Sequence, residues 1–184
     1  DKTGTLTEGE FAISETKVYA KGMSETEFMH LTAIAEQKSN HPLAASILAV
    51  VDALEVDPNR IRGYQEVAGR GTELYLDDKQ LLAGNVAWLK ENEIALPSDL
   101  NDKLAGTAIY VAYDRHLLGF VRLEDKIKNS VPEALSEMRR QGLKRAIMVT
   151  GDAEATAKKV STELKLDGYE ANCLPQDKID AVVR

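Results

Sequence analysis

The stretch DKTGTLT at residues 1–7 is the most informative part of this sequence. Its aspartate, hydroxyl side chains, glycine and lysine offer a carboxylate nucleophile, Asp1, beside backbone N–H groups that can bind phosphate oxygens. A polar terminal segment without a function is the simpler interpretation, because chain termini are commonly exposed. The seven residues alone favour phosphate chemistry, and the strength of that hypothesis depends on partners far away in the sequence.

Three further motifs lie in the last third of the chain. Residues 150–152, Thr-Gly-Asp, directly follow an apolar run at 146–149, and residues 175–178 read Pro-Gln-Asp-Lys. Residues 125–128, Asp-Lys-Ile-Lys, place an acidic residue before basic ones. Together with residues 1–7 these motifs extend over the whole chain. Four such motifs in the order found in one known family are improbable by chance.

In these motifs the chain resembles the P-type ATPases. Residues 1–7 are similar to the phosphorylation motif of that family, and residues 150–152 are similar to the second motif of its phosphorylation domain. Residues 175–178 look like the segment that supplies a phosphate-binding lysine, and residues 125–128 look like the motif at the domain hinge.

The middle of the chain narrows the resemblance. Glu36, His41-Pro42, Gly69-x-Gly71 and Gly84-Asn85 are similar to positions in the nucleotide-binding domain of heavy-metal-transporting P-type ATPases. Each piece is weak alone, because His-Pro and Gly-Asn commonly cap helices, Gly-x-Gly is usually a turn, and a helical glutamate is usually solvated. Jointly, between the phosphorylation motifs, they favour an ATP site.

The resemblance implies roles in phosphoryl transfer. Asp1 would attack the γ-phosphate of ATP, and Mg²⁺ would bridge the Asp1 carboxylate, the Thr3 carbonyl and the phosphate. Lys178 and Thr150 would place an ammonium and a hydroxyl on the transferred group, and Asp152 would stay near the Mg²⁺ and the nucleotide. The candidate catalytic residues are Asp1, Lys2, Thr3, Thr150 and Lys178, with Asp1 and Thr3 as metal ligands.

The same resemblance implies roles in nucleotide binding. His41 would pack against adenine, Glu36 would accept a hydrogen bond from the exocyclic amine, and Gly69 and Gly71 would let the backbone approach the nucleotide closely. The candidate nucleotide-binding residues are Glu36, His41, Gly69, Gly71, Gly84, Asn85, Asp125, Gly151 and Asp152.

The order of elements predicts the fold class. An apolar strand at 146–149 between helices at 130–140 and 153–164 is typical of a parallel sheet, whereas the period-two segments between 61 and 123 are typical of antiparallel strands. The pattern thus predicts an α/β fold in which an antiparallel block is inserted into a parallel-sheet domain. The resemblance implies that these parts are an incomplete, parallel-sheet, haloacid-dehalogenase-like phosphorylation domain (1–12 and 123–184) and an inserted antiparallel α+β nucleotide-binding domain (13–122). Other helices are expected from 25 to 35, from 42 to 54, at 86–91, at 98–105 and after 175, with Asn129 or Ser130 capping the helix that ends at 140.

Composition excludes several classes of function. The 184 residues carry 23 Lys and Arg against 30 Asp and Glu, a formal charge of -7, so nucleic acid is not an expected partner. The longest nearly apolar stretch, 43–51, is too short to span a bilayer. The single cysteine, Cys173, excludes an internal disulfide and a multi-cysteine metal site.

Three functional readings stay open. The first is the ATP-binding and phosphorylation region of a heavy-metal pump, the second is a soluble aspartate-nucleophile phosphatase with an inserted cap domain, and the third is a non-catalytic nucleotide-binding module. Thr3 favours the first over the second, because related phosphatases usually have a second aspartate there as acid and base. The resemblance implies a strand before Asp1 and a further Mg²⁺ carboxylate after Arg184. We therefore expect a cytosolic fragment of a plasma-membrane pump that binds ATP but turns it over poorly. Its expected partners are the membrane and actuator domains of the pump, with the heavy-metal cation bound outside this chain.

Overall fold

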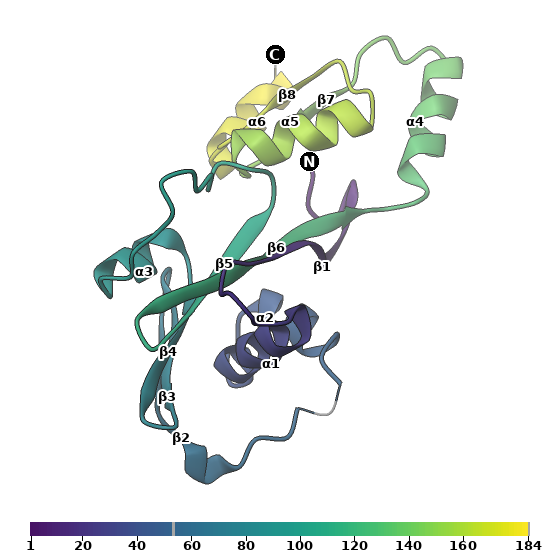
Figure 1. Cartoon of the computed structure of the whole chain (residues 1–184). Coiled ribbons are helices and arrows are strands. Elements are labelled where there is room, and N and C mark those ends of the chain that lie inside the picture. The colour runs from purple at the N-terminus through teal and green to yellow at the C-terminus, as the bar shows by residue number, and fades with distance from the viewer. Residues whose placement is uncertain (53, 184) are drawn as a thin grey trace. The chain divides into compact units, whose positions relative to one another are not determined.

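A computed structural model describes residues 1–52 and 54–183, which divide into two compact units (Figure 1). Unit 1 contains residues 1–10, 103–106 and 124–184, and unit 2 contains residues 11–102 and 107–123. The boundaries expected from the sequence lie within two residues of the outer divisions. Segment 103–106 belongs to unit 1, although sequence reasoning assigned it to the inserted domain.

A six-stranded sheet is the main element of unit 2, with the strand order β1-β6-β5-β4-β3-β2. The strands are β1 (Thr7–Val18), β2 (Ile61–Val67), β3 (Gly71–Leu76), β4 (Lys79–Gly84), β5 (Thr107–Tyr113) and β6 (His116–Ile127). The pairs from β2 through β6 are antiparallel, as the alternation of the sequence predicted. β1 and β6 also extend into unit 1 at one end.

Helices pack on this sheet because its strands alternate their side chains between two faces. Leu81 belongs to the apolar cluster of α1 (Glu25–Glu36) and α2 (Pro42–Leu48), whereas its neighbour Leu82 belongs to the cluster of α3 (Val86–Glu91). Trp88 of α3 is only 7% exposed and belongs to the second cluster. A short 3₁₀ helix, η1 (Pro58–Arg60), precedes β2.

Local sequence explains where α1 begins. The Ser24 side chain accepts a hydrogen bond from Glu27 N at 3.1 Å, and the Glu27 carboxylate accepts one from Ser24 N at 2.8 Å. This reciprocal capping box satisfies two N–H groups that the first turn of a helix leaves unpaired. The helix start predicted from the sequence is confirmed.

Two helix predictions in unit 2 are wrong. α2 ends at Leu48, so Val50, Val51 and Leu54, expected to continue its apolar face, lie beyond the helix; residue 53 lies outside the described residues. The β-branched pair Val50-Val51 lowers helix propensity there. No helix forms at 98–105, because Asp99 and Asn101 favour turns through local side-chain hydrogen bonds.

Unit 1 contains the parallel pair that the apolar run predicted. β7 (Ile147–Val149) pairs in parallel with β8 (Gly168–Glu170). Met148 packs beneath α5 (Glu154–Glu163) in a core that includes Ala157 and Val160. The remaining helices are α4 (Val131–Arg140) and α6 (Pro175–Val183). Among the described residues, no helix is both long enough and apolar enough to cross a bilayer.

One capping prediction in unit 1 is only half right. Ser130 occupies the N-cap position of α4, but its side chain makes no capping hydrogen bond. Its backbone is already helical, with φ -77° and ψ -18°. A side-chain cap normally requires an extended N-cap residue, and Ser130 does not have that conformation.

Candidate functional site

Residues 1–7 fold back on themselves in unit 1. The backbone N–H groups of Thr5, Leu6 and Thr7 all point at the Lys2 carbonyl, with N to O distances of 3.2, 2.8 and 3.2 Å. Gly4 makes the reversal with φ +76°, a conformation that glycine adopts without steric cost. The turn leaves Asp1 and Thr3 exposed and buries Lys2.

Asp1 lies against a lysine 177 positions later in the sequence. Lys178 Nζ donates to Asp1 Oδ1 at 2.7 Å, and Thr5 Oγ1 donates to Asp1 Oδ2 at 3.2 Å. The side chains of Lys178 and Asp1 are 39% and 50% exposed. An ammonium in this position can lie beside a phosphoryl group carried by Asp1, while the carboxylate stays accessible.

Lys2 forms the buried centre of a second group of charges. Its side chain is 4% exposed, and Nζ lies 3.1 Å from Asp152 Oδ2 and 3.9 Å from Asp125 Oδ2. Asp125 also accepts hydrogen bonds from Thr7 Oγ1 at 2.6 Å and from Gly9 N at 3.1 Å. These contacts fasten the first segment to β6. Asp125 was a predicted nucleotide-binding residue, but in this structure it is buried and occupied by the chain's own donors.

Thr150 and Asp152 bond to one another at the end of β7. Thr150 Oγ1 donates to Asp152 Oδ2 at 2.6 Å, and Asp152 N donates to Thr150 Oγ1 at 3.2 Å. Thr150 is 3% exposed and its hydroxyl donates to Asp152 in this structure; its contact with phosphate stays a prediction. Gly151 lies between them, and Asp152 connects the pair to Lys2. The structure thus groups Asp1 with Lys178, and Lys2 with Asp125, Thr150 and Asp152.

The residues at Asp1 fit a magnesium ion of a particular kind. Mg²⁺ prefers oxygen ligands and usually binds through one or two carboxylates, completing its shell with phosphate oxygens and water. Asp1 is a half-exposed carboxylate, whereas Asp125 and Asp152 are paired with Lys2. In the described part of the chain, no three His, Cys, Asp or Glu groups cluster as a ready-made metal site. Asp1 and the Thr3 carbonyl therefore suit an ion that arrives with phosphate.

A cavity in unit 2 collects the predicted nucleotide-binding residues of the middle block. Its volume is about 500 Å³, within the range of small-molecule sites. Predicted residues on its wall are Glu36, His41, Gly69, Gly71, Gly84 and Asn85. Sequence reasoning missed other residues of the wall, among them Ser39, Asn40, Glu66, Arg70, Thr72, Thr107 and Ala108. The pairing of Glu66 with Thr72 across β2 and β3 brings two of these beside the glycines.

Glu36 is buried at this cavity and is not a solvated helical residue. It is 4% exposed, at the last position of α1. Burial, and then the negative charge of Glu66, raises the pKa of Glu36 to about 7, while the hydroxyls of Ser39 and Thr72 act in the opposite direction. The carboxyl group therefore changes its charge near neutral pH.

His41 has a capping role in addition to its place at the cavity. Its Nδ1 accepts a hydrogen bond from Leu43 N at 3.2 Å, so it is the N-cap of α2. The residue is exposed and lines the cavity. The capping and adenine-packing interpretations are compatible, because the cap uses one ring nitrogen and leaves the faces of the ring accessible.

The glycines that line the cavity are required for different physical reasons. A Cβ at Gly71 would lie 2.1 Å from the Ala83 carbonyl oxygen, and one at Gly84 would lie 2.4 Å from the Arg70 carbonyl oxygen. Gly69 has φ +71°, and a Cβ there would meet no atom within 4 Å. The expected reason, close approach of a nucleotide, thus has room at Gly69, whereas at Gly71 neighbouring backbone already explains the glycine.

Alanine at Gly71 is expected to destabilise the protein more than alanine at Gly69. The overlap with Ala83 forces the backbone of β3 or β4 to shift, which costs about 3 kcal/mol, whereas the positive φ at Gly69 costs about 1 kcal/mol. Urea unfolding followed by Trp88 fluorescence measures both variants. Equal losses of stability would contradict the strand-packing explanation.

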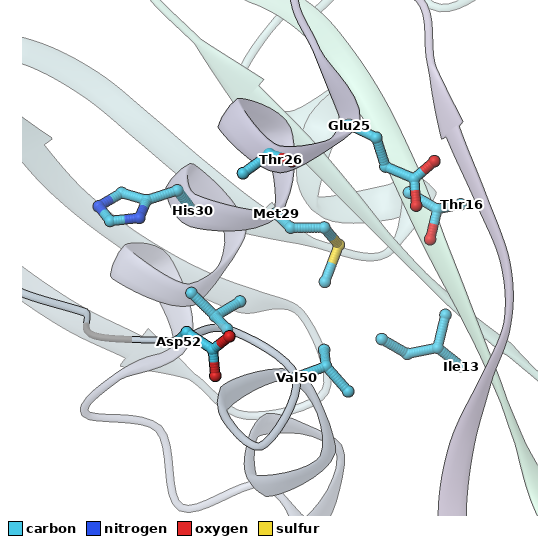
Figure 2. Close-up of a pocket in the computed structure, with 9 residues that line it drawn as sticks. Ile13, Thr16, Glu25, Thr26, Met29, His30, Val50 and Asp52 are labelled. Carbon is cyan, nitrogen blue, oxygen red and sulfur yellow. The ribbon is translucent and has the colours of Figure 1, made fainter.

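A second cavity in unit 2, of about 550 Å³, lies between β1 and α1 (Figure 2). Ile13, Met29 and Val50 supply apolar wall, and Glu25 and Asp52 supply carboxylates. It contains none of the predicted site residues.

Comparisons with known proteins assign the chain to a family. A family model described as haloacid dehalogenase-like hydrolase matches residues 1–182. The zinc-transporting ATPase of Synechocystis sp. is 35% identical over 182 residues, covering 99% of this chain and 24% of that protein. The cadmium, zinc and cobalt-transporting ATPase of Bacillus subtilis is 33% identical, covering 99% of this chain and 25% of that protein. The chain thus spans about a quarter of the length of these curated relatives.

Solved structures of P-type ATPases are also similar to this chain. A zinc-transporting PIB-type ATPase in its E2.Pi state matches with a TM-score of 0.81 at 28% identity, over 99% of this chain and 30% of that chain. The catalytic domain of the CPx-ATPase CopB-B matches with a TM-score of 0.72 over 99% of this chain and 63% of that chain; at 21% identity this likeness shows the fold. The chain therefore belongs to the haloacid dehalogenase-like hydrolase family, and over its length it is similar to a part of heavy-metal-transporting P-type ATPases.

Proposed function

We propose that this chain is the ATP-binding and phosphorylation region of a pump that exports heavy-metal cations. ATP hydrolysis through an aspartyl-phosphate at Asp1 would drive the export. The observation that carries the proposal is the 2.7 Å contact between Asp1 Oδ1 and Lys178 Nζ. The names of the relatives, which include zinc, cadmium and cobalt transporters, support a divalent heavy metal as cargo. The membrane and actuator domains of such a pump, in a plasma membrane, are the proposed partners.

The proposed reaction is an in-line displacement on the γ-phosphorus of ATP. A carboxylate oxygen of Asp1 forms the new P–O bond, the bond to the bridging oxygen of ADP breaks, and ADP leaves with the electron pair. Lys178 stabilises the negative charge on the transferred group, since its ammonium already lies at the carboxylate. When bound at Asp1 and the Thr3 carbonyl, Mg²⁺ supplies further neutralisation of phosphate charge.

Unit 2 is proposed to bind the base of ATP. The cavity has the right size, His41 offers an exposed ring, and Glu36 offers a carboxyl group within it. Base stacking on a ring and one or two polar contacts are enough to fix an adenine. ATP titration followed by NMR is the direct test, and the amides of residues 36–41 and 69–72 should shift first.

Removing the imidazole of His41 is expected to weaken ATP binding about tenfold, because base stacking contributes about 1–3 kcal/mol. His41→Ala also deletes the cap of α2, so His41→Asn is the matched variant, since asparagine retains N-capping ability. Both variants should lose affinity in a calorimetric titration. An unchanged dissociation constant for ATP in His41→Asn would show that the imidazole does not contribute to ATP binding and that His41 only caps α2.

A further inference from the structure

Two carboxyl groups share the wall of the nucleotide cavity without a cation between them. Glu36 reaches it from the end of α1 and is 96% buried, whereas Glu66 reaches it from β2 and is exposed at the rim. Among the described residues, no Lys or Arg forms an ion pair with either carboxylate, and Arg70, the cation of the wall, pairs with Glu91 at 2.7 Å. A negative charge on Glu36 is therefore poorly compensated.

Glu66 is held in place by the loop that follows α1. Ser39 Oγ donates to Glu66 Oε1 at 3.0 Å, and Asn40 N donates to Glu66 Oε2 at 3.5 Å. These donors occupy the Glu66 oxygens, whereas Glu36 is the buried carboxyl group of the two, and burial favours its neutral, protonated form. The shift in the pKa of Glu36 to about 7 agrees with this assignment.

We propose that Glu36 meets the base of the nucleotide as a protonated carboxylic acid, and that Glu66 is a specificity-determining residue that keeps this proton in place. The inference rests on the function proposed above and defines which base the cavity accepts. A carboxylic acid presents one donor beside one acceptor. Adenine presents the complementary edge, with N1 accepting and the N6 amine donating. Guanine presents two donors, N1–H and the N2 amine, which match an ionised carboxylate instead.

The proposal makes base selectivity depend on pH. ATP affinity is full below the pKa of Glu36, where the acid is already protonated, and falls as pH rises above it, because binding must then take up a proton. For one linked proton the affinity falls about tenfold between pH 6 and pH 8. Over the same pH interval the affinity for GTP rises relative to that for ATP, because an ionised Glu36 matches the two hydrogen-bond donors of guanine.

Other polar groups lie around Glu36 on several elements of unit 2. β2 contributes Tyr64 as well as Glu66, and Lys38 lies 5.8 Å from the centre of the Tyr64 ring. β3 contributes the Thr72 hydroxyl, and the start of α2 contributes His41. Among the described residues that line the cavity, β4 and β5 contribute no ionisable side chain. The His41 imidazole lines the same cavity, so it needs a control.

The test uses the complete 184-residue chain and isothermal titration calorimetry with ATP and GTP from pH 6 to pH 8.5, in buffers of different ionisation enthalpy. Wild-type protein should take up close to one proton per ATP at pH 8. Glu36→Gln replaces the acid with an amide that also presents a donor beside an acceptor, so its ATP affinity should lose the tenfold pH dependence. Glu66→Gln should move the midpoint of the pH dependence down by about half a pH unit, because the screened charge of one neighbour is removed.

Three controls make the outcome decisive. Glu55→Gln removes an exposed carboxylate of unit 2 outside the cavity and should behave as wild type. His41→Asn should retain the pH dependence at reduced affinity. The triphosphate itself titrates in this range, so the slopes of variants are compared with the same nucleotide.

Two results would overturn the inference in distinguishable ways. If ATP binds with no proton uptake, or if Glu36→Gln retains the wild-type slope, the protonated acid is excluded while the nucleotide cavity stands. If neither nucleotide binds at any pH, the proposed function of the cavity fails as well.

Discussion

Asp1→Asn is expected to abolish the phosphorylated intermediate. An amide is a much weaker nucleophile than a carboxylate, and loss of a catalytic nucleophile costs about 10⁴-fold or more in rate. Lys178→Ala should lower the rate of phosphorylation about 10²- to 10³-fold, since it removes a preorganised charge from the transferred group. These are the largest functional effects that the structure predicts.

The measurement is incorporation of γ-labelled phosphate from ATP into acid-stable, hydroxylamine-sensitive protein, carried out on the full-length protein, which is proposed to be a pump. Asp180→Asn on α6 and Lys144→Ala in an exposed loop are matched controls, and both should label normally. Normal labelling of Asp1→Asn would show that another residue is the nucleophile. Normal labelling of Lys178→Ala would show that the 2.7 Å contact between Lys178 and Asp1 is a structural ion pair without a role in phosphoryl transfer.

Lys2→Met is expected to cause the largest loss of stability, about 3–5 kcal/mol in unit 1. The methionine fills a similar volume but leaves Asp125, 3% exposed, as a buried charge without a cation. Thr7 Oγ1 and Gly9 N still donate to Asp125, but neutral donors do not replace a positive charge. The first segment should therefore detach from β6 more easily.

Hydrogen exchange of the Leu6 and Lys128 amides follows this detachment, together with urea unfolding. Lys126→Met is the matched control, because its pair with Glu8 at 3.8 Å is 57% exposed on the lysine side and contributes less than about 1 kcal/mol. Adding Asp125→Asn to Lys2→Met should recover part of the loss, because the unpaired charge is gone. Equal stability of Lys2→Met and Lys126→Met would show that the buried network does not hold the segment.

The sequence determined elements whose signals are local. Alternating apolar residues predicted β2 to β6, and the capping box at Ser24 predicted the start of α1, because side-chain period and caps act within a few residues. The failures were also local: at Val50-Val51 and at 98–105 a helix was expected, but β-branched and turn-forming residues do not continue one.

The order of the motifs was enough to nominate Asp1, His41 and Lys178 as site residues, because several weak motifs together resemble one family. Their roles stay predictions. Only the tertiary structure decided which side chains share a space: it placed Lys178 at Asp1, turned Thr150 towards Asp152, and brought Glu66 to the same cavity as Glu36. It also showed that Gly71 is required by neighbouring backbone. Burial and charge neighbours depend on contacts between distant segments, and these set the pKa of Glu36, so no local pattern in the sequence could have revealed it.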